Sequence, residues 1–436
     1  MKKTAVRWLV GFLILGLLLS GMSVSAASHV RILVDTEESA THAMIMNGRT
    51  MVPLEMIQES MHVDASWEDG KLVLTFAEKT VLLTENDHLA WVDDEEVMID
   101  SPLIMVSETP WIPLAFISTA FGHEVSWNDH NRTVEIMTRT NRLFSEYVQA
   151  IAATGSLLLN GEMGDLHEAI VASGEWDTEE NELFRSVLEK IKEANDVTYV
   201  YTLVKSGSDE EPTLLISESD YPDEFGDEYE MEPQFLEAFA GKPSYAVHFW
   251  EEDGITMKSA FAPIYNTAGE VVAILGIDTE YETMNHDANR LISAKVKAMA
   301  STGALLLNGG MGDLHEVILE SGEWDTEENE TFRSILKAIK EINGATYVYS
   351  FVWDTEEQVL LISESDYPDE FGTPYDMEPQ FLLAFDGAPA AANHIWVDED
   401  AMKSAFAPIY NSAGAIVALL GIDFEAPELA YVPELH

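Results

Sequence analysis

The chain contains one long segment twice. Three runs recur almost unchanged in the same order: LLISESDYPDEFG at Leu214–Gly226 and Leu360–Gly372, SGEWDTEEN at Ser173–Asn181 and Ser321–Asn329, and KSAFAPIYN at Lys258–Asn266 and Lys403–Asn411. The spacing shortens along the chain in polar stretches, and surface loops tolerate such losses. A repeat of about 140 residues is also far longer than the 20–50 residues of solenoids and propellers. The chain therefore carries two copies of one domain, which we call copy 1 and copy 2.

The first 26 residues have the pattern of a secretory signal peptide. Lys2, Lys3 and Arg7 precede an apolar run at Trp8–Leu19, and Val24-Ser25-Ala26 follows as a small-residue cleavage site. This run is shorter than the roughly 20 residues that a membrane helix needs. We expect a secreted, extracellular protein with no membrane span once residues 1–26 are removed, and an uncleaved anchor is the alternative. The sequence has no cysteine, which excludes disulfides and a lipid-modified N-terminal cysteine.

The formal charge of −55 restricts the possible partners. Such a surface repels phosphate backbones, so we expect no nucleic acid partner. Solubility in a salty or alkaline medium is one interpretation of the acidic residues, and calcium binding is another. No D-x-[DN]-x-[DN]-G loop is present, which favours the first interpretation. The hydrophobic content of 47% argues against disorder.

Residues 27–140 contain a repeat of their own. Met51–Leu54 matches Trp111–Leu114, and Trp67 matches Trp127, each pair 60 residues apart. Each half predicts a strand, a short helix that begins at a proline, and further strands with period-2 alternation. We therefore expect a mixed α/β module in this region.

The run Asn47–Leu54, followed by Val63 and Trp67, resembles the copper amine oxidase N-terminal-like domain, also called the stalk domain. The second half fits less closely, because Ser107–Pro110 stands where the first half has Asn-Gly-Arg-Thr. The resemblance implies an accessory module without oxidase chemistry. None of the twelve histidines forms a His-x-His pair, and no Asn-Tyr pair is present, so we expect no copper and no other resident cofactor.

Copy 1 covers residues 141–285 and copy 2 covers residues 286–426, with 427–436 as a tail. In copy 1 we predict an apolar helix over 143–159, and a second helix that starts at a capping box formed by Asp177 and Glu180. Strands are predicted at 198–204, 213–217, 257–265 and 270–278, with a short helix near Pro233. This order indicates an antiparallel sheet with helices on one side, so the fold class is α+β.

The order of motifs in each copy looks like a Cache domain, the PAS-like extracytoplasmic sensor module of bacterial receptors. The motifs are Tyr-Val-Tyr-Thr-Leu-Val, an Asp-bearing loop, and Lys-Ser-Ala-Phe-Ala-Pro-Ile-Tyr-Asn followed by a strand that ends at Asp278 or Asp423. The resemblance implies a pocket for a small metabolite, usually an amino acid, amine or carboxylate. Cache sensors normally lie between two membrane helices, and neither Asp278 nor Asp423 is followed by one, so we expect transduction through a partner or binding alone.

Lys258 and Lys403 are the first candidates for the pocket wall, because cations are scarce in this chain. Strand alternation puts Lys258, Ala260 and Ala262 on one face, where the alanines would leave space for a ligand carboxylate. A cross-strand ion pair is the alternative role for these lysines.

Aromatic and acidic residues complete the predicted sites. Paired tyrosines could hold an apolar or cationic ligand or belong to the core, the tryptophans could wall a cage or pack, and the acids could receive an ammonium group or cap a strand. The candidates are Tyr199, Tyr201, Asp220, Trp250 and Asp278 in copy 1, and Tyr347, Tyr349, Asp366, Trp396 and Asp423 in copy 2.

These features predict a secreted, non-catalytic protein in which a stalk-type module displays two small-molecule pockets. The sequence has no nucleophile elbow, no H-E-x-x-H and no phosphate-binding glycine loop, so we do not expect an enzyme. The alternative is a structural or adhesive surface protein without a ligand. A cell-wall component or a membrane receptor would be the macromolecular partner.

Overall fold

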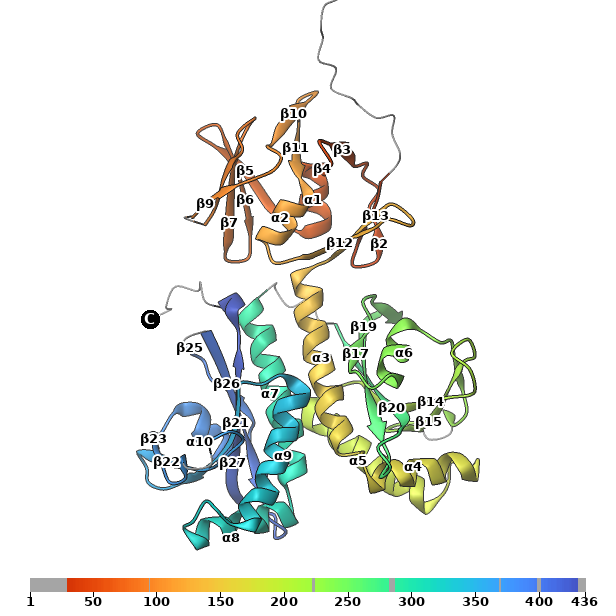
Figure 1. Ribbon diagram of the computed structural model, residues 1–436, viewed down its shortest axis with the longest axis vertical. Helices are drawn as coiled ribbons and strands as arrows, with labels where there is room; N and C mark the ends of the chain where they lie inside the picture. Colours follow the sequence, from red (N-terminus) through yellow and green to blue (C-terminus); the bar gives the residue numbers. More distant parts are fainter. Residues whose placement is uncertain are drawn as a thin grey trace, which may run out of the picture.

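The computed structural model describes residues 30–429, apart from Asp94, 222–223, 282–286, 368–369 and 398–400. The predicted signal peptide lies outside these residues. The stalk module lies at one end of the molecule, and the two copies lie side by side beneath it, with helices α3 (Arg139–Leu157) and α7 (Ala288–Leu307) between their sheets (Figure 1). None of the helices in the described part of the chain is long and apolar enough to cross a membrane.

The stalk module consists of three sheets around two short helices. The helices α1 (Leu54–Met61) and α2 (Leu114–Ala120) follow Pro53 and Pro113 directly. The sheets have the strand orders β12-β13-β1-β2, β10-β11-β4-β3 and β5-β6-β7-β8-β9. Their strands are β1 Arg31–Val34, β2 Glu37–Glu38, β3 Met44–Met46, β4 Arg49–Pro53, β5 Asp64–Glu68, β6 Lys71–Phe76, β7 Lys79–Thr84, β8 Leu89–Val92, β9 Glu95–Met98, β10 Ile104–Val106, β11 Thr109–Pro113, β12 Glu124–Asn128 and β13 Thr133–Met137.

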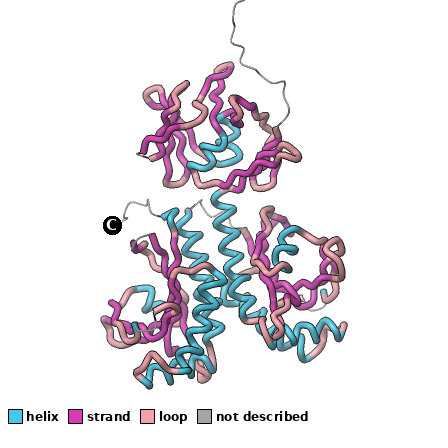
Figure 2. The backbone as a smooth tube through the Cα atoms, viewed as in Figure 1, coloured by secondary structure: helices cyan, strands magenta, loops and turns pink. Residues whose placement is uncertain are grey.

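Each copy folds into one antiparallel sheet with long helices on one face (Figure 2). The order in copy 1 is β16-β15-β14-β20-β19-β17, with β18 paired to β19. Besides α3, copy 1 contains α4 Glu162–Ser173, α5 Glu179–Asn195, β14 Tyr199–Lys205, β15 Thr213–Glu218, β16 Glu228–Tyr229, α6 Pro233–Phe239, β17 Ser244–Tyr245, β18 Trp250–Glu252, β19 Ile255–Tyr265 and β20 Val271–Glu280. The α+β class is therefore correct.

Copy 2 repeats this arrangement in the order β23-β22-β21-β27-β26-β24, with β25 paired to β26. Besides α7, it contains α8 Gly310–Ser321, α9 Glu327–Asn343, β21 Tyr347–Trp353, β22 Gln358–Glu364, β23 Pro374–Asp376, α10 Pro379–Phe385, β24 Ala390–Ala391, β25 Trp396–Val397, β26 Ala401–Tyr410, β27 Ile416–Glu425 and the short 3-10 helix η3 Pro427–Leu429.

Two helical details differ from the sequence predictions. The helix α5 is capped by Thr178, whose hydroxyl accepts a hydrogen bond from the backbone N–H of Asn181, so Asp177 is not the N-cap. Both residues are good capping types, and the local backbone decides between them. The helix α4 is absent from the sequence predictions, although Met163, Leu166 and Ile170 stand at helical spacing and pack against the core.

The two faces of the copy 1 sheet carry different cores. Ala260, Ala262 and Leu275 belong to a cluster that also contains residues of α3 and α7, so the two copies share one continuous core. Phe261, Tyr201 and Phe235 form a smaller cluster on the opposite face, beside α6. The alternation along β19 thus sends alanines to the helices and Phe261 to the other side.

The helices α3 and α7 pair about an approximate two-fold axis. Asn343 donates to the hydroxyl of Thr154 at 2.9 Å, and Asn195 donates to the hydroxyl of Thr302 at 2.8 Å. Thr302 and Asn343 are the copy 2 equivalents of Thr154 and Asn195. The same contact is therefore made twice with the copies exchanged, which is the reciprocity of an isologous interface.

The stalk module is bonded to the start of α3. Asp35 accepts hydrogen bonds from the backbone N–H and the hydroxyl of Thr138, the N-cap of α3, at 2.8 and 2.6 Å. The next residue, Arg139, donates its backbone N–H to His123 at 2.9 Å and pairs with Glu78 at 2.7 Å. These contacts hold the stalk module on copy 1.

Candidate functional site

Each copy contains a pocket between its sheet and the loops around its short helix. The volume is about 360 Å³ in copy 1 and about 540 Å³ in copy 2. The two walls are built from equivalent aromatic and acidic residues. In copy 1 these are Tyr199, Tyr201, Glu218, Tyr221, Glu224, Tyr229, Glu232, Phe235, Trp250, Phe261 and Asp278, and in copy 2 they are Tyr347, Tyr349, Glu364, Tyr367, Glu370, Tyr375, Glu378, Phe381, Trp396, Phe406 and Asp423.

Three neighbouring strands form the floor of the copy 1 pocket. Asp278 lies opposite Tyr199 on one side and opposite Ser259 on the other. Residues directly opposite in an antiparallel pair have Cβ atoms about 4.5–5.5 Å apart, so the three side chains gather at one point. The strand register, rather than any local motif, therefore brings them together.

A glycine lets Tyr201 cover this floor. Gly276 is paired with Tyr201 and Phe261, and a Cβ atom at Gly276 would collide with the ring of Tyr201. The ring can therefore lie across the strand, and its hydroxyl donates to Asp278 at 3.3 Å. In copy 2 the hydroxyl of Tyr349 donates to Asp423 at 3.0 Å, and Gly421 has the same close approach.

The carboxyl group at the base of each pocket is strongly perturbed. Burial raises the pKa of Asp278 to about 7, although its hydrogen bonds to Ser259 and Tyr201 act in the opposite direction. Burial raises the pKa of Asp423 to about 6 in the same way. Burial also raises the pKa of Glu218. A cation placed beside these groups would favour their ionised forms, so the pockets are suited to positive charge.

A tryptophan forms one wall of each pocket in a fixed orientation. The indole N–H of Trp250 donates to the hydroxyl of Ser259 at 2.9 Å, and that of Trp396 donates to Ser404 at 2.8 Å. The hydroxyl of Tyr199 donates to Glu252, which lies on the same strand β18 as Trp250, at 3.0 Å. These bonds hold aromatic faces around the carboxyl group.

Lys258 and Lys403 do not line the pockets, so this prediction is wrong. The ammonium group of Lys258 donates to the side-chain oxygen of Asn141 in α3 at 2.5 Å and to the carbonyl oxygen of Val247 at 2.9 Å. It also lies 4.3 Å from the ring centroid of Phe249. Lys403 donates to Asn289 in α7 at 2.8 Å. The alternation along the strand was predicted correctly, but the space beside the alanines holds a helix rather than a ligand.

Asp220 and Asp366 also lie outside the pocket walls. Asp220 pairs with Lys192 at 2.6 Å, and Asp366 pairs with Lys340 at 2.5 Å. Both acids are at exposed turns that follow the strands, and each accepts a hydrogen bond from the preceding serine. The other eight predicted residues line the pockets, four in each copy.

Sequence reasoning missed much of the acidic wall. Glu218 is buried and lines the copy 1 pocket, and His248 lies 3.6 Å from Glu232 there. Glu218 and Tyr221 stand in the run that is repeated letter for letter, but that run contains many acids, and nothing local distinguishes the inward ones. The lining residues of both pockets, within the described ranges, include no lysine or arginine.

The stalk resemblance is confirmed by a family model. Residues 33–136 match the model described as "Copper amine oxidase N-terminal domain". A search of curated proteins finds no match to the sequence. Among the described residues, no three histidine, aspartate or glutamate side chains are arranged to hold a metal ion.

Similar solved structures include three bacterial sensor domains. The sensor domain of the V. cholerae histidine kinase DctB has 12% identity and a TM-score of 0.25, with 66% of this chain and 95% of that chain covered. The ligand-binding domain of the Pseudomonas aeruginosa PAO1 amino acid chemoreceptor PctC, in complex with GABA, has 13% identity, a TM-score of 0.18, and coverages of 66% and 100%. The ligand-binding domain of the Campylobacter jejuni chemoreceptor Tlp3, in complex with 4-methylisoleucine, has 10% identity and a TM-score of 0.18, with 69% of this chain and 97% of that chain covered. These likenesses are partial.

Proposed function

We propose that each copy captures a small organic cation, such as an amine, and that the protein is a secreted, non-catalytic binding protein of the sensor type. The observation that supports this most directly is the buried Asp278 beneath Tyr201, in a pocket whose described wall holds several acids and no lysine or arginine. Asp423 and Tyr349 repeat this arrangement in copy 2.

The chemistry of the wall favours a cation over a carboxylate. A positive charge over the faces of Trp250 and Tyr199 would gain about 0.5–2 kcal/mol from each favourable ring contact. Burial of a cation without a counter-charge would be unfavourable, and Asp278 supplies that charge when it ionises. A carboxylate ligand would face Glu218, Glu232 and Asp278 and would be repelled. Of the three predicted ligand classes, amines therefore fit best.

Display outside the cell rests on the signal-like segment at residues 1–26 and on the stalk-type module. The module is bonded to α3 at Thr138, close to copy 1. We propose that a cell-wall or membrane-receptor component contacts this assembly and receives the bound state. Calcium remains a testable ligand of the acidic surface.

A thermal-shift titration tests the proposed ligand class. The probes are tetramethylammonium and putrescine, with succinate as the anionic control and calcium in parallel. A cation at 100 times its dissociation constant should raise the free energy of unfolding by about 2.7 kcal/mol. The double variant Asp278→Asn with Asp423→Asn should abolish that gain, and Asp220→Asn, outside the pocket, should leave it unchanged. No shift with any cation would favour a structural surface protein without a ligand.

A further inference from the structure

Copy 2 carries an exposed apolar surface on the side of its sheet away from α7 (Figure 1). Trp353 at the end of β21 and Leu382 and Leu383 on α10 are 45%, 47% and 54% exposed. Phe385 connects them, because its ring lies 5.2 Å from that of Trp353 and it stands one turn after Leu382 on the helix. We call these four residues the α10 patch.

The equivalent positions of copy 1 are charged. The repeat aligns Trp353 with Lys205 and Leu383 with Glu237. Both copies have the same fold, so the fold itself does not require apolar residues at these positions. Single exposed apolar side chains are common on protein surfaces, whereas several that lie together mark an interaction site.

In copy 1 a solvated cation covers the ring that Trp353 extends in copy 2. The ammonium group of Lys205 lies 5.0 Å from the ring centroid of Phe239, the equivalent of Phe385, and pairs with Asp209 at 2.6 Å. The difference between the copies therefore replaces a polar cover with an exposed aromatic surface.

Exposed acids border the α10 patch. The turn at 354–357 follows Trp353 and contributes Asp354, Glu356 and Glu357, and Asp386 is the C-cap of α10. The elements that carry the patch thus combine apolar side chains with a rim of negative charge.

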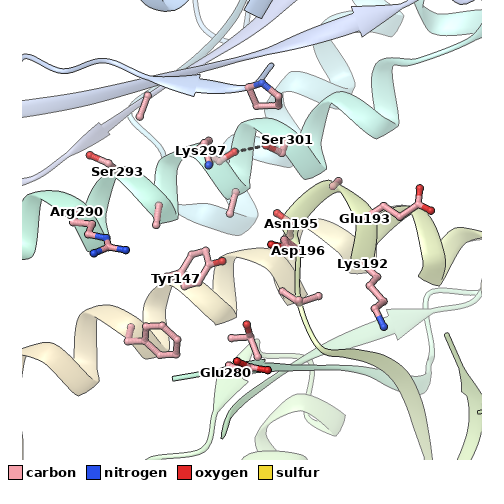
Figure 3. Close-up of a pocket in the computed structure, with 18 of the residues that line it drawn as sticks. Tyr147, Lys192, Glu193, Asn195, Asp196, Glu280, Arg290, Ser293, Lys297 and Ser301 are labelled. Atoms are coloured by element: carbon pink, nitrogen blue, oxygen red, sulfur yellow. Dashed lines mark hydrogen bonds between the residues drawn. The ribbon is translucent and has the colours of Figure 1, made fainter. Parts of the chain in front are cut away.

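The cations of copy 2 belong to other elements. Every lysine and arginine of this copy stands in α7, α9 or β26, and both helices pack on the opposite face of the sheet. Lys403 of β26 donates to Asn289 of α7. Arg290 and Lys297 border the cleft between the copies, which Lys192 of copy 1 also lines (Figure 3). None of β21, the turn after it or α10 contains a lysine or arginine.

We propose that the α10 patch is a docking surface for a cationic amphipathic segment of another protein. The apolar face of that segment would cover Trp353, Leu382 and Leu383, and its lysines or arginines would lie beside the acidic rim. A second copy of this chain would bring a formal charge of −55 and the same rim against this one, and an anionic lipid surface would be repelled as well. The proposal does not depend on what the two pockets bind.

Fluorescence anisotropy of a labelled helical peptide tests this proposal. The probe has leucines on one face and lysines on the other, and it is titrated with the full chain at about 0.15 M salt. One control peptide has glutamines in place of the leucines, and another has glutamates in place of the lysines. We expect saturable binding of the probe with a dissociation constant at or below about 100 μM, and binding of either control that is at least about tenfold weaker.

Charge-neutral variants assign the binding to the α10 patch. Trp353→Lys combined with Leu383→Glu introduces the copy 1 residues without changing the net charge, and it should weaken the probe about 10–100-fold. Leu382→Gln is a milder variant and should weaken it about 3–10-fold. The matched control is Lys205→Glu combined with Glu237→Lys in copy 1, which is also charge-neutral and should leave the affinity unchanged.

Three results would overturn the proposal. The first is no saturable binding of the probe, or equal binding of the glutamine control, which would mean that the acidic surface attracts any cationic peptide. The second is unchanged binding in the Trp353→Lys and Leu383→Glu double variant. The third is a dimer in sedimentation, or flotation of the chain with phosphatidylcholine vesicles, that this double variant abolishes, because the occupant would then be a second copy or a membrane.

Discussion

Copy 1 and copy 2 have nearly the same sequence around the buried lysine, yet the lysine is held differently in each. In copy 1, Lys258 and the side-chain amide of Asn141 both donate to the carbonyl oxygen of Val247, each at 2.9 Å. Lys403 has a hydrogen bond to Asn289. Asn141 lies three residues after Thr138, which is bonded to Asp35 of the stalk module.

The surroundings of the two lysines explain the difference. Burial lowers the pKa of Lys258 to about 7, with Asp35 of the stalk module acting in the opposite direction. Burial lowers the pKa of Lys403 as well, and there the nearby acid is Asp287, which belongs to copy 2 itself. The acid that acts on the pKa of each lysine therefore comes from a different module: Asp35 of the stalk module for Lys258, and Asp287 of copy 2 for Lys403. The duplicated sequence gives both copies equivalent pocket walls, whereas the module next to each copy determines the surroundings of its buried lysine.

The largest expected effect distinguishes these two lysine contacts. Asn141→Ala should lower the free energy of unfolding by about 3–5 kcal/mol, because it removes a partner from a buried ammonium group. Asn289→Ala should cost less, about 1–2 kcal/mol, since Asn289 is only half-buried. Urea denaturation of both variants measures this difference, and equal losses would mean that the stalk module does not strengthen the copy 1 contact.

The buried carboxyl groups should reduce stability at high pH, more strongly in copy 1. The folded pKa of Asp278 is about 7 against an ordinary 3.8, so the folded state binds the proton more tightly. Stability from this group is therefore full below pH 3.8 and is lost as the pH rises to about 7. Asp278→Asn should raise stability by about 2–4 kcal/mol at pH values above that range, and by almost nothing near pH 3.

The matching change in copy 2 sharpens the comparison. Asp423→Asn should give a smaller gain, about 1–3 kcal/mol, because the pKa of Asp423 is raised only to about 6. Thermal unfolding at several pH values measures both gains. Asp220→Asn is the control, because Asp220 is paired with Lys192 outside the pocket and should not stabilise the protein. If Asp278→Asn were less stable than the parent protein at high pH, burial of the ionised Asp278 carboxylate would not be the cost proposed here.

Ligand affinity should depend on pH at a different midpoint in each copy. A cation binds the ionised carboxylate best, so affinity for tetramethylammonium should rise as the pH increases and level off above about 7 in copy 1 and about 6 in copy 2. Below these values the affinity should fall about tenfold per pH unit if Asp278 or Asp423 must ionise. Calorimetric titrations of the single variants separate the two sites. A pH-independent affinity would exclude these carboxyl groups as the counter-charge.

The smallest expected effects concern the paired contacts across the two-fold axis. Asn195→Ala and Asn343→Ala should each cost about 1 kcal/mol, the usual net value of one hydrogen bond. The two losses should be equal, because the bonds to Thr302 and Thr154 are the same contact with the copies exchanged. Urea denaturation compares them. A larger loss for Asn343→Ala would show that the neighbouring ion pair between Lys295 and Glu146, 2.9 Å long, strengthens its side of the axis.

Several structural features could be predicted from local sequence. The duplication, the α+β class and most strand positions followed from repeats and alternation, as at Lys258–Phe261 in β19. Eight of the twelve predicted site residues lie in the pocket walls, since paired tyrosines and strand-end acids are visible in the letters. The stalk resemblance at residues 33–136 was equally local.

The remaining features depend on partners far away in the chain. Alternation assigned Lys258 and Phe261 to opposite faces of β19 but could not say which face α3 covers, because that depends on a helix more than 100 residues earlier. Asp220 and Asp278 both stand near strand ends in the sequence, but Asp220 is exposed and pairs with Lys192, whereas Asp278 is buried, and no motif records that difference. The inward position of Glu218 likewise depends on how the loop after β15 folds back.

The order of residues alone determined that this chain builds one α+β unit twice, with the same aromatic and acidic groups in each, because a repeated sequence repeats its local structure. Tertiary structure alone decided which face of each sheet became a pocket and which face the helices cover. A pocket is a space between elements, and its shape depends on side chains that are distant in the sequence, because close-packed interiors leave room only where no neighbour fills it.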